Sequence, residues 1–211
     1  MLRSGRVLAV VLATIAGLVA LPSAALAPPL ECGGAPVTIV GTTGNDTLNG
    51  TSGIDVIMGL AGNDTIEGKG AHDYICGGPG ADVILGSGGL TSGGDHVWGD
   101  DGNDRILASF DGPNFIWGEA GQDQLVGGND GDTMRGGGGD DFLNGWNGND
   151  DLFGQEGIDN FSDGKGYDSI DGGADMDTAN RCPDGNNDQT TWVSVQFLTA
   201  PDDFYCTLYF N

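Results

Sequence analysis

The sequence predicts an all-β solenoid of about fifteen stacked nonapeptide repeats, closed by a short β capping tail. Three observations predict this fold. From residue 41 to residue 180 the chain divides into nine-residue units, and glycine and aspartate recur at fixed positions within them. One apolar residue occupies the eighth position of every unit. A single unit cannot bury that residue, whereas stacked units bury a continuous apolar row.

The units follow one another regularly, and only two of them are longer than nine residues. The unit at Gly86 carries four extra residues and the unit at Ala108 carries one. The sixth position is aspartate in every unit except one, where Asn114 stands. These aspartates are Asp46, Asp55, Asp64, Asp73, Asp82, Asp95, Asp104, Asp123, Asp132, Asp141, Asp150, Asp159, Asp168 and Asp177. Such a constant phase is not a matter of chance, so the position has a defined role.

Each recurring residue type has a physical reason. Glycines at the first and fourth positions supply turns with positive φ, which residues with a Cβ adopt only at a cost. The residues around the eighth position form a short strand with one side chain pointing inward. Aspartates of successive coils would then lie about 4.8 Å apart, and such a column of carboxylates repels itself unless cations lie between them. Oxygen ligands favour a hard cation, which outside the cell is calcium.

The repeat resembles the repeats-in-toxin, or haemolysin-type, calcium-binding nonapeptide G-G-x-G-x-D-x-U-x. The units GDDGNDRIL (99–107) and GGGGDDFLN (136–144) match it closely. The resemblance covers residues 41–180 and implies a parallel β-roll with two repeats per coil, in which six residues form a calcium turn and three form a strand. It implies that the aspartates named above bind calcium between successive turns, together with backbone carbonyls. The sixth position departs from the pattern at Asn114, and the glycine positions depart from it at Ala71, Ala108, Asp130, Asp163 and Asp175.

The composition agrees with a protein that binds cations. The 211-residue chain has 31 acidic residues against 7 lysines and arginines, a formal net charge of −24. Such a surface repels nucleic acids and anionic membranes and attracts cations. We expect roughly ten calcium ions. We also expect a monomer that is largely unfolded without calcium and folds on binding it.

The two ends of the chain predict export and capping. Residues 1–25 combine a short positive segment, an uncharged run and small residues, which is typical of a secretory signal peptide. We therefore expect a secreted, extracellular protein without membrane insertion after cleavage, whose charge becomes 5 − 31 = −26 once Arg3 and Arg6 are removed. Residues 26–40 would cap one end of the solenoid. Residues 181–211 contain two strand-like segments, which would form a capping hairpin at the other end.

The four cysteines fit an oxidising compartment. Their number is even and no C-x-x-C spacing occurs, which disfavours zinc or redox chemistry. Four cysteines allow three pairings. We expect Cys32–Cys76 and Cys182–Cys206, because each of these disulfides would staple one end of the molecule.

Catalysis is not expected. The segments outside the repeats are too short for a catalytic core, and the chain contains neither H-E-x-x-H nor G-x-S-x-G. Its two histidines, His72 and His96, stand at variable repeat positions and are expected to be surface residues. A remnant or accessory of an extracellular hydrolase is a further alternative, which the missing motifs disfavour.

A binding surface is the main alternative to a purely structural role. If the two insertions preserve the alternation of the units, outward strand positions place Tyr74, Trp98, Phe115 and Trp117 in an aromatic ladder. A row of exposed aromatic rings suits a glycan or a protein partner. In the other interpretation, the apolar C-terminal tail covers the ladder.

Overall fold

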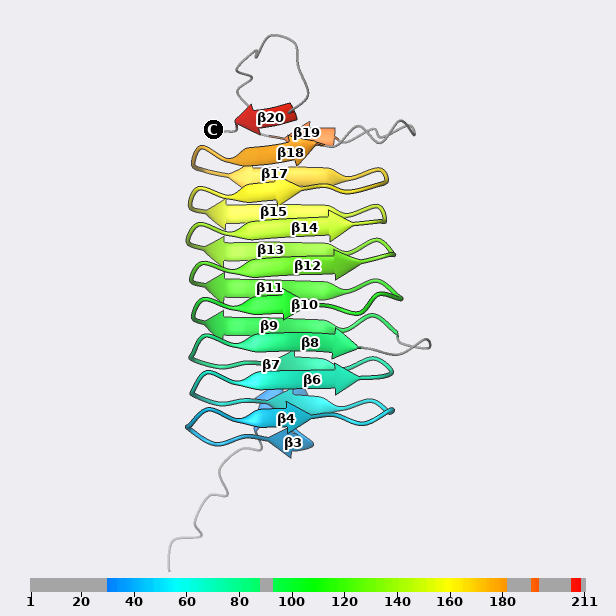
Figure 1. The fold of residues 1–211 in the computed structure, drawn as a ribbon, viewed down its shortest axis with the longest axis vertical. Helices are drawn as coiled ribbons and strands as arrows, with labels where there is room; N and C mark the ends of the chain where they lie inside the picture. Colours follow the sequence, from blue (N-terminus) through cyan, green and yellow to red (C-terminus); the bar gives the residue numbers. More distant parts are fainter. Residues whose placement is uncertain (1–29, 88–92, 182–190, 194–205, 210–211) are drawn as a thin grey trace, which may run out of the picture.

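The computed structural model describes residues 30–87, 93–181, 191–193 and 206–209. The predicted signal peptide, residues 1–25, lies outside these residues. Within them the chain forms an elongated solenoid of two parallel sheets, with coils stacked along the long axis (Figure 1). Each nine-residue unit supplies one strand, and two units complete a coil. The predicted all-β solenoid is therefore confirmed.

The two sheets lie back to back, and successive strands alternate between them. The first sheet consists of β4 (Thr47–Asn49), β6 (Thr65–Lys69), β8 (Val83–Ser87), β10 (Arg105–Leu107), β12 (Gln124–Gly128), β14 (Phe142–Trp146), β16 (Asn160–Ser162), β18 (Thr178–Arg181) and β20 (Cys206–Tyr209). The second sheet consists of β3 (Ile39–Val40), β5 (Val56–Met58), β7 (Tyr74–Cys76), β9 (His96–Asp101), β11 (Phe115–Ala120), β13 (Thr133–Gly138), β15 (Asp151–Glu156), β17 (Ser169–Gly173) and β19 (Thr191–Val193).

The two insertions leave the register of the strands unchanged. Tyr74 pairs with His96 across the four-residue insertion, and His96 pairs with Phe115 across the single-residue insertion. The backbone ladder therefore keeps the same register on both sides of each insertion. Each position of the repeat consequently forms a straight column along the solenoid.

The core is one narrow row of side chains from each sheet. The eighth-position residues from Ile57 to Ala179 are buried, and most of them have no exposed surface. Leu48 in the first coil is only partly buried and packs against the end of this row, as does Ile39 of β3. Because each coil contributes only two such side chains, it is stable only when neighbouring coils cover it.

The N-terminal segment folds over the outer face of the second sheet. β1 (Glu31–Cys32) and β2 (Ala35–Pro36) form an antiparallel hairpin, and a disulfide joins Cys32 to Cys76 of β7. This confirms the predicted Cys32–Cys76 pair. The other expected pair, Cys182–Cys206, lies outside the residues whose side chains the structure describes.

The C-terminal strands differ from the predicted hairpin. β19 extends the second sheet by pairing in parallel with β17, whereas β20 pairs antiparallel with β18 of the first sheet. The hairpin prediction was wrong because the open end of the roll offers two sheet edges, and each strand takes one of them. No helix long and apolar enough to cross a membrane occurs among the residues that the structure describes.

Candidate metal sites at the turns

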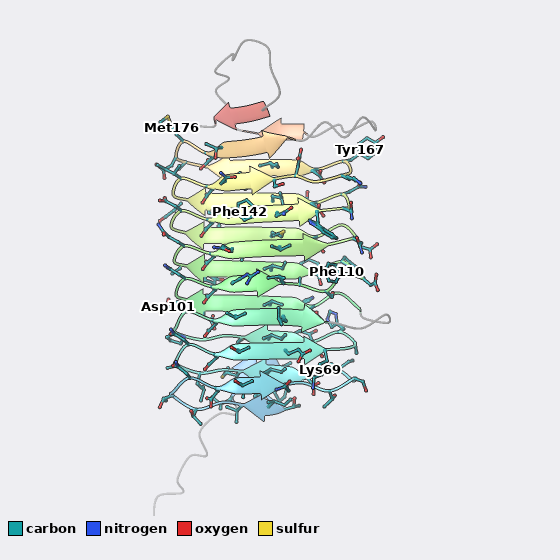
Figure 2. The ribbon with its side chains drawn as sticks, in the orientation of Figure 1. Lys69, Asp101, Phe110, Phe142, Tyr167 and Met176 are labelled. Carbon is teal, nitrogen blue, oxygen red and sulfur yellow. A yellow bond between two sulfur atoms is a disulfide. The ribbon has the colours of Figure 1, made fainter. Side chains whose placement is uncertain are left out.

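The turns line the two long edges of the solenoid. We call first edge the turns that precede strands of the first sheet, and second edge those that precede strands of the second sheet. In Figure 2, Asp101 and Met176 mark the first edge, while Phe110 and Tyr167 mark the second edge on the opposite side. The sixth-position aspartates therefore form two columns: those of the first edge run from Asp46 to Asp177, and those of the second edge from Asp55 to Asp168.

From Asp64 onward, one carboxylate oxygen of each sixth-position aspartate joins neighbouring coils. The backbone N–H of Asp46 donates to Asp64 Oδ1 at 2.7 Å, and that of Asp104 donates to Asp123 Oδ1 at 2.8 Å. The same bond recurs on the second edge, where the N–H of Asp132 donates to Asp150 Oδ1 at 2.8 Å. The carboxylates are thereby fixed inside the turns, with their second oxygens facing the next coil.

The second oxygen, Oδ2, is buried and accepts no hydrogen bond in most of these turns. This holds for Asp64, Asp73, Asp82, Asp95, Asp104, Asp123, Asp141, Asp150, Asp159 and Asp177. A buried carboxylate oxygen without a partner costs free energy on the order of several kcal/mol. Such a repeated cost along both edges indicates that a cation is the missing partner.

The glycine at the first position leaves space beside this oxygen. A Cβ added to Gly99 would touch Asp104 Oδ2 and would lie 2.8 Å from the carbonyl oxygen of Gly118 in the next coil. A Cβ on Gly118 would likewise meet Asp123 Oδ2 and the carbonyl oxygen of Gly136. A carboxylate oxygen and a carbonyl oxygen thus face one small space that only glycine keeps open.

Burial raises the pKa of the turn aspartates well above the ordinary value of 3.8. The pKa is raised to about 7 for Asp73, Asp104, Asp141 and Asp150, and to about 6 for Asp82, Asp95, Asp123, Asp132 and Asp159. The bond from the preceding coil's backbone lowers the pKa in part, while for most of them the charges of neighbouring aspartates raise it further. Without a counter-ion, the buried environment of both columns therefore disfavours the charged form of these aspartates.

The donor set fits a hard divalent cation. Among the described residues, no group of three or more His, Cys, Asp or Glu side chains is placed to hold one ion. Each turn offers a single sixth-position carboxylate, so backbone carbonyls and water must complete the coordination. Calcium accepts this mixture of carboxylate and carbonyl oxygens, whereas the sulfur and nitrogen ligands that softer metals prefer do not recur from turn to turn in the repeat.

Three aspartates satisfy their second oxygen within the protein. Thr42 donates to Asp46 Oδ2 from its backbone N–H at 2.6 Å and its hydroxyl at 2.9 Å, and Thr51 binds Asp55 in the same way. The N–H of Gly128 donates to Asp132 Oδ2 at 2.6 Å. These three sixth positions were predicted as calcium ligands, and the structure gives the second oxygen of each a hydrogen-bond donor within the protein; as calcium ligands they stay a prediction. A threonine at the second position was the sequence signal for the first two.

The turn at Asn114 has an uncharged side chain at its sixth position, and the protein itself supplies all the partners of this side chain. The Ser109 hydroxyl donates to Asn114 Oδ1 at 2.6 Å, and Asn114 Nδ2 donates to the Ser109 carbonyl at 3.0 Å and to Asp132 Oδ1 at 2.8 Å. All polar groups of this buried side chain are thus bonded. The column of the second edge is interrupted here by a turn that needs no ion.

Aspartates at the glycine positions leave the turns intact. Asp130 Oδ2 accepts from the N–H of Gly112 at 2.7 Å, and Asp175 Oδ2 accepts from the N–H of Gly157 at 3.2 Å. The Asp163 side chain is buried, and its Oδ1 accepts from the N–H of Gly164 at 3.0 Å. Each carboxylate therefore replaces a glycine by bonding to a neighbouring backbone amide.

The predicted aromatic ladder forms on the outer face of the second sheet. Tyr74, His96 and Phe115 follow one column, with ring centroids 5.0 and 4.8 Å apart, and Trp98 and Trp117 follow the next. The two indoles are parallel, with an interplanar angle of 1° and centroids 4.7 Å apart. Because that spacing matches the distance between strands, the rings stack on each other and their faces are already in contact.

The N-terminal hairpin packs on the lower end of this ladder. Cys32, Val56 and Cys76 form a second buried cluster against which Tyr74 and Trp98 pack. The sequence suggested the C-terminal tail as a cover, but the described cover is the N-terminal hairpin, which the disulfide holds in place. Phe115, with 38% of its surface exposed, lies beyond the hairpin.

Comparison with known proteins supports the assignment of the turns. The family model of the RTX calcium-binding nonapeptide repeat, which spans four copies, matches residues 38–52, 49–84, 91–110, 111–134, 126–161 and 153–180. A search of curated proteins found no match to the chain. The matched segments coincide with the two edges of turns and the strands between them. The chain therefore belongs to the family of RTX calcium-binding nonapeptide repeat proteins.

Proposed function

We propose that this protein is a secreted, non-catalytic calcium-binding roll, which folds as calcium ions bind between the turns of successive coils. The buried, unpartnered Oδ2 atoms of the sixth-position aspartates carry this proposal. Bound calcium supplies the positive charge that each buried carboxylate lacks. The protein's own residues supply the fixed geometry, since the Oδ1 of each sixth-position aspartate from Asp64 onward accepts a hydrogen bond from the backbone of the preceding coil.

The two edges are expected to bind different numbers of ions. On the first edge, each aspartate from Asp64 to Asp159 has an unpartnered Oδ2 that faces another turn. On the second edge, Asn114 and Asp132 interrupt this pattern through bonds within the protein. We therefore infer that the first edge holds more ions than the second, within a total on the order of ten.

Secretion and the absence of catalysis rest on separate support. Residues 1–25 have the pattern of a signal peptide, and the Cys32–Cys76 disulfide suits an oxidising compartment. The rings of His72 and His96 pack edge to face, 4.9 Å apart, among aromatic neighbours, which favours a packing role for both histidines over a catalytic one.

The aromatic ladder is assigned to packing between coils. The faces of its stacked rings are in contact with each other and do not offer a sugar a flat platform.

Circular dichroism with and without calcium tests the proposal. In EDTA the purified protein lacking residues 1–25 should lose most of its β-sheet signal, and added calcium should restore it cooperatively. Magnesium at the same concentration serves as the control, because its small octahedral shell suits these mixed turns poorly. A β-sheet signal that is the same in EDTA and in calcium would contradict the proposal.

A further inference from the structure

A disulfide, a second apolar cluster and two threonine caps, none of which requires an ion, come together at the N-terminal end of the roll. The disulfide between Cys32 and Cys76 closes a loop with a sequence separation of 44 residues, which spans the first coils. A crosslink over such a loop restricts the unfolded chain and stabilises whatever structure the loop encloses. No other disulfide is present among the residues whose side chains the structure describes.

Among the residues whose side chains the structure describes, a second apolar cluster forms at this end alone. Cys32 is 1% exposed, and it packs with Val56 and Cys76 on the outside of the second sheet. Tyr74 and Trp98 complete this cluster from the aromatic ladder. The first coils are thus covered on both faces of the second sheet, whereas the other described coils have no second buried cluster outside the inner row.

The first coil also supplies hydrogen-bond donors to its own turn carboxylates. Thr42 and Thr51 donate to the second oxygens of Asp46 and Asp55, so neither edge requires a cation there. The next aspartate of the first edge, Asp64, has no such partner for Oδ2, and this oxygen faces the following coil. If the later coils are unfolded, that oxygen is open to water and its burial cost disappears.

We infer that the N-terminal end, residues 31–76, is a calcium-independent nucleus on which the rest of the roll grows as calcium binds. This inference rests on the proposed function. Growth proceeds toward the C-terminus, because each new coil needs the sheet edges and the apolar row of the preceding coil as a template. The aromatic columns continue from β7 through β9 to β11, which favours addition of these coils first.

Hydrogen exchange measured by mass spectrometry in EDTA tests the inference on the full chain without residues 1–25. Peptides from residues 31–76 should exchange at least about tenfold more slowly than peptides from residues 115–177. In saturating calcium both regions should be protected. Fast exchange throughout the chain in EDTA, or protection only in the C-terminal coils, would overturn the inference while leaving calcium-dependent folding intact. Equal protection with and without calcium would instead contradict the proposed function.

The disulfide can be tested with the double variant Cys32→Ser and Cys76→Ser. N-terminal protection in EDTA should be lost. The calcium concentration at the folding midpoint should rise only about two- to threefold, because many binding ions together compensate for the folding free energy that the disulfide no longer supplies. The control is Cys182→Ser with Cys206→Ser, which should leave the protection of residues 31–76 unchanged. If the control pair removed that protection and the first pair did not, the inference would be wrong.

The threonine caps provide a second test that does not involve the disulfide. Thr42→Val with Thr51→Val removes the hydroxyl donors but keeps the β-branched shape. It should speed exchange of residues 31–76 in EDTA several-fold. The matched control, Thr47→Val with Thr65→Val, changes exposed threonines on neighbouring strands and should have no such effect. If the two double variants changed the exchange of residues 31–76 in EDTA equally, the inference of a calcium-independent nucleus would be contradicted.

Discussion

At the scale of single residues, glycine sets how closely the coils approach. Gly80, Gly102 and Gly121 stand at the fourth position with φ of +154°, +148° and +145°. A Cβ on Gly102 would overlap the carbonyl oxygen of Gly80, and a Cβ on Gly121 would overlap that of Gly102. The positive φ and the close approach both exclude other residues.

The substitution Gly102→Ala should therefore be strongly destabilising. We expect a loss of about 3 kcal/mol or more in calcium, because the backbone of one coil must move away from the next. Gly138→Ala is the control, since a Cβ there meets nothing within 4 Å and its φ is not positive. Thermal unfolding in saturating calcium measures both; equal unfolding temperatures would show that coil spacing is not fixed at this position.

Neutralising a sixth-position carboxylate should stabilise the roll without calcium and destabilise it with calcium. Asp150→Asn removes a buried charge but keeps an oxygen for the N–H of Asp132, and its amide can donate to a carbonyl as Asn114 does. At pH 8 in EDTA this should stabilise any folded form by roughly 3 kcal/mol, whereas in calcium it should weaken ion binding. Urea unfolding and calcium titration measure the two effects. Asp151→Asn, at an exposed neighbour whose charge raises the pKa of Asp150 only as a minor cause, should have much smaller effects on both.

At the scale of elements, each column of turns acts as one titrating unit. Folded pKa values of about 6 to 7, as at Asp123 and Asp104, lie above the value of 3.8 expected for the unfolded chain. The ion-free roll therefore binds more protons when folded than when unfolded. Its stability is greatest below about pH 4 and is lost as the pH rises through 6 to 7.

Acid should therefore partly replace calcium. In calcium-free buffer the β-sheet signal should be larger at pH 5 than at pH 8, because protons neutralise the buried carboxylates. With calcium present, the folding midpoint should move to higher calcium concentration as the pH falls, because protons compete for the same oxygens. Circular dichroism across this pH range measures both trends. A calcium-free signal that increases with pH would contradict the charge argument.

At the scale of the whole molecule, excess charge and local coordination are separate problems. The formal charge of −24 repels the chain from itself over long distances, and salt weakens this repulsion. Salt does not supply a partner to a carboxylate oxygen held inside a turn. The fold therefore depends on filled sites more than on a low net charge.

High sodium chloride should consequently fail to replace calcium. In EDTA with about 1 M sodium chloride, where the screening length is about 3 Å, the chain should become more compact without regaining its β-sheet signal. Small-angle X-ray scattering and circular dichroism on the same samples separate compaction from folding. Recovery of the full β-sheet signal in salt alone would show that overall repulsion, and not coordination, keeps the chain unfolded.

The sequence predicted those features that repeat. A residue such as Ile106 or Leu125 is buried in the structure because its phase in the repeat already places it inward. The strands were expected to have three residues, but β9 and β11 continue into the following turn, since parallel neighbours there also bond along the backbone. Periodicity finds an element well where neighbouring coils impose the same environment.

Features that occur once were not predictable in the same way. The docking of Cys32 beside Trp98 depends on contacts between residues far apart in sequence, and no pattern records where a hairpin will lie. The bonds of Thr42 and Ser109 depend on side-chain geometry within a single turn. The two C-terminal strands were recognised, but their partners were not, because two equivalent sheet edges were available to them.

The stacked indoles of Trp98 and Trp117 have a practical consequence. They belong to neighbouring coils, β9 and β11, and lie parallel at 4.7 Å. Two chromophores in such contact couple optically, and they separate as soon as the coils part. The near-ultraviolet circular dichroism spectrum of the unmodified protein should therefore contain a signal from the contact between these two coils. This signal reports their docking independently of the total β-sheet content.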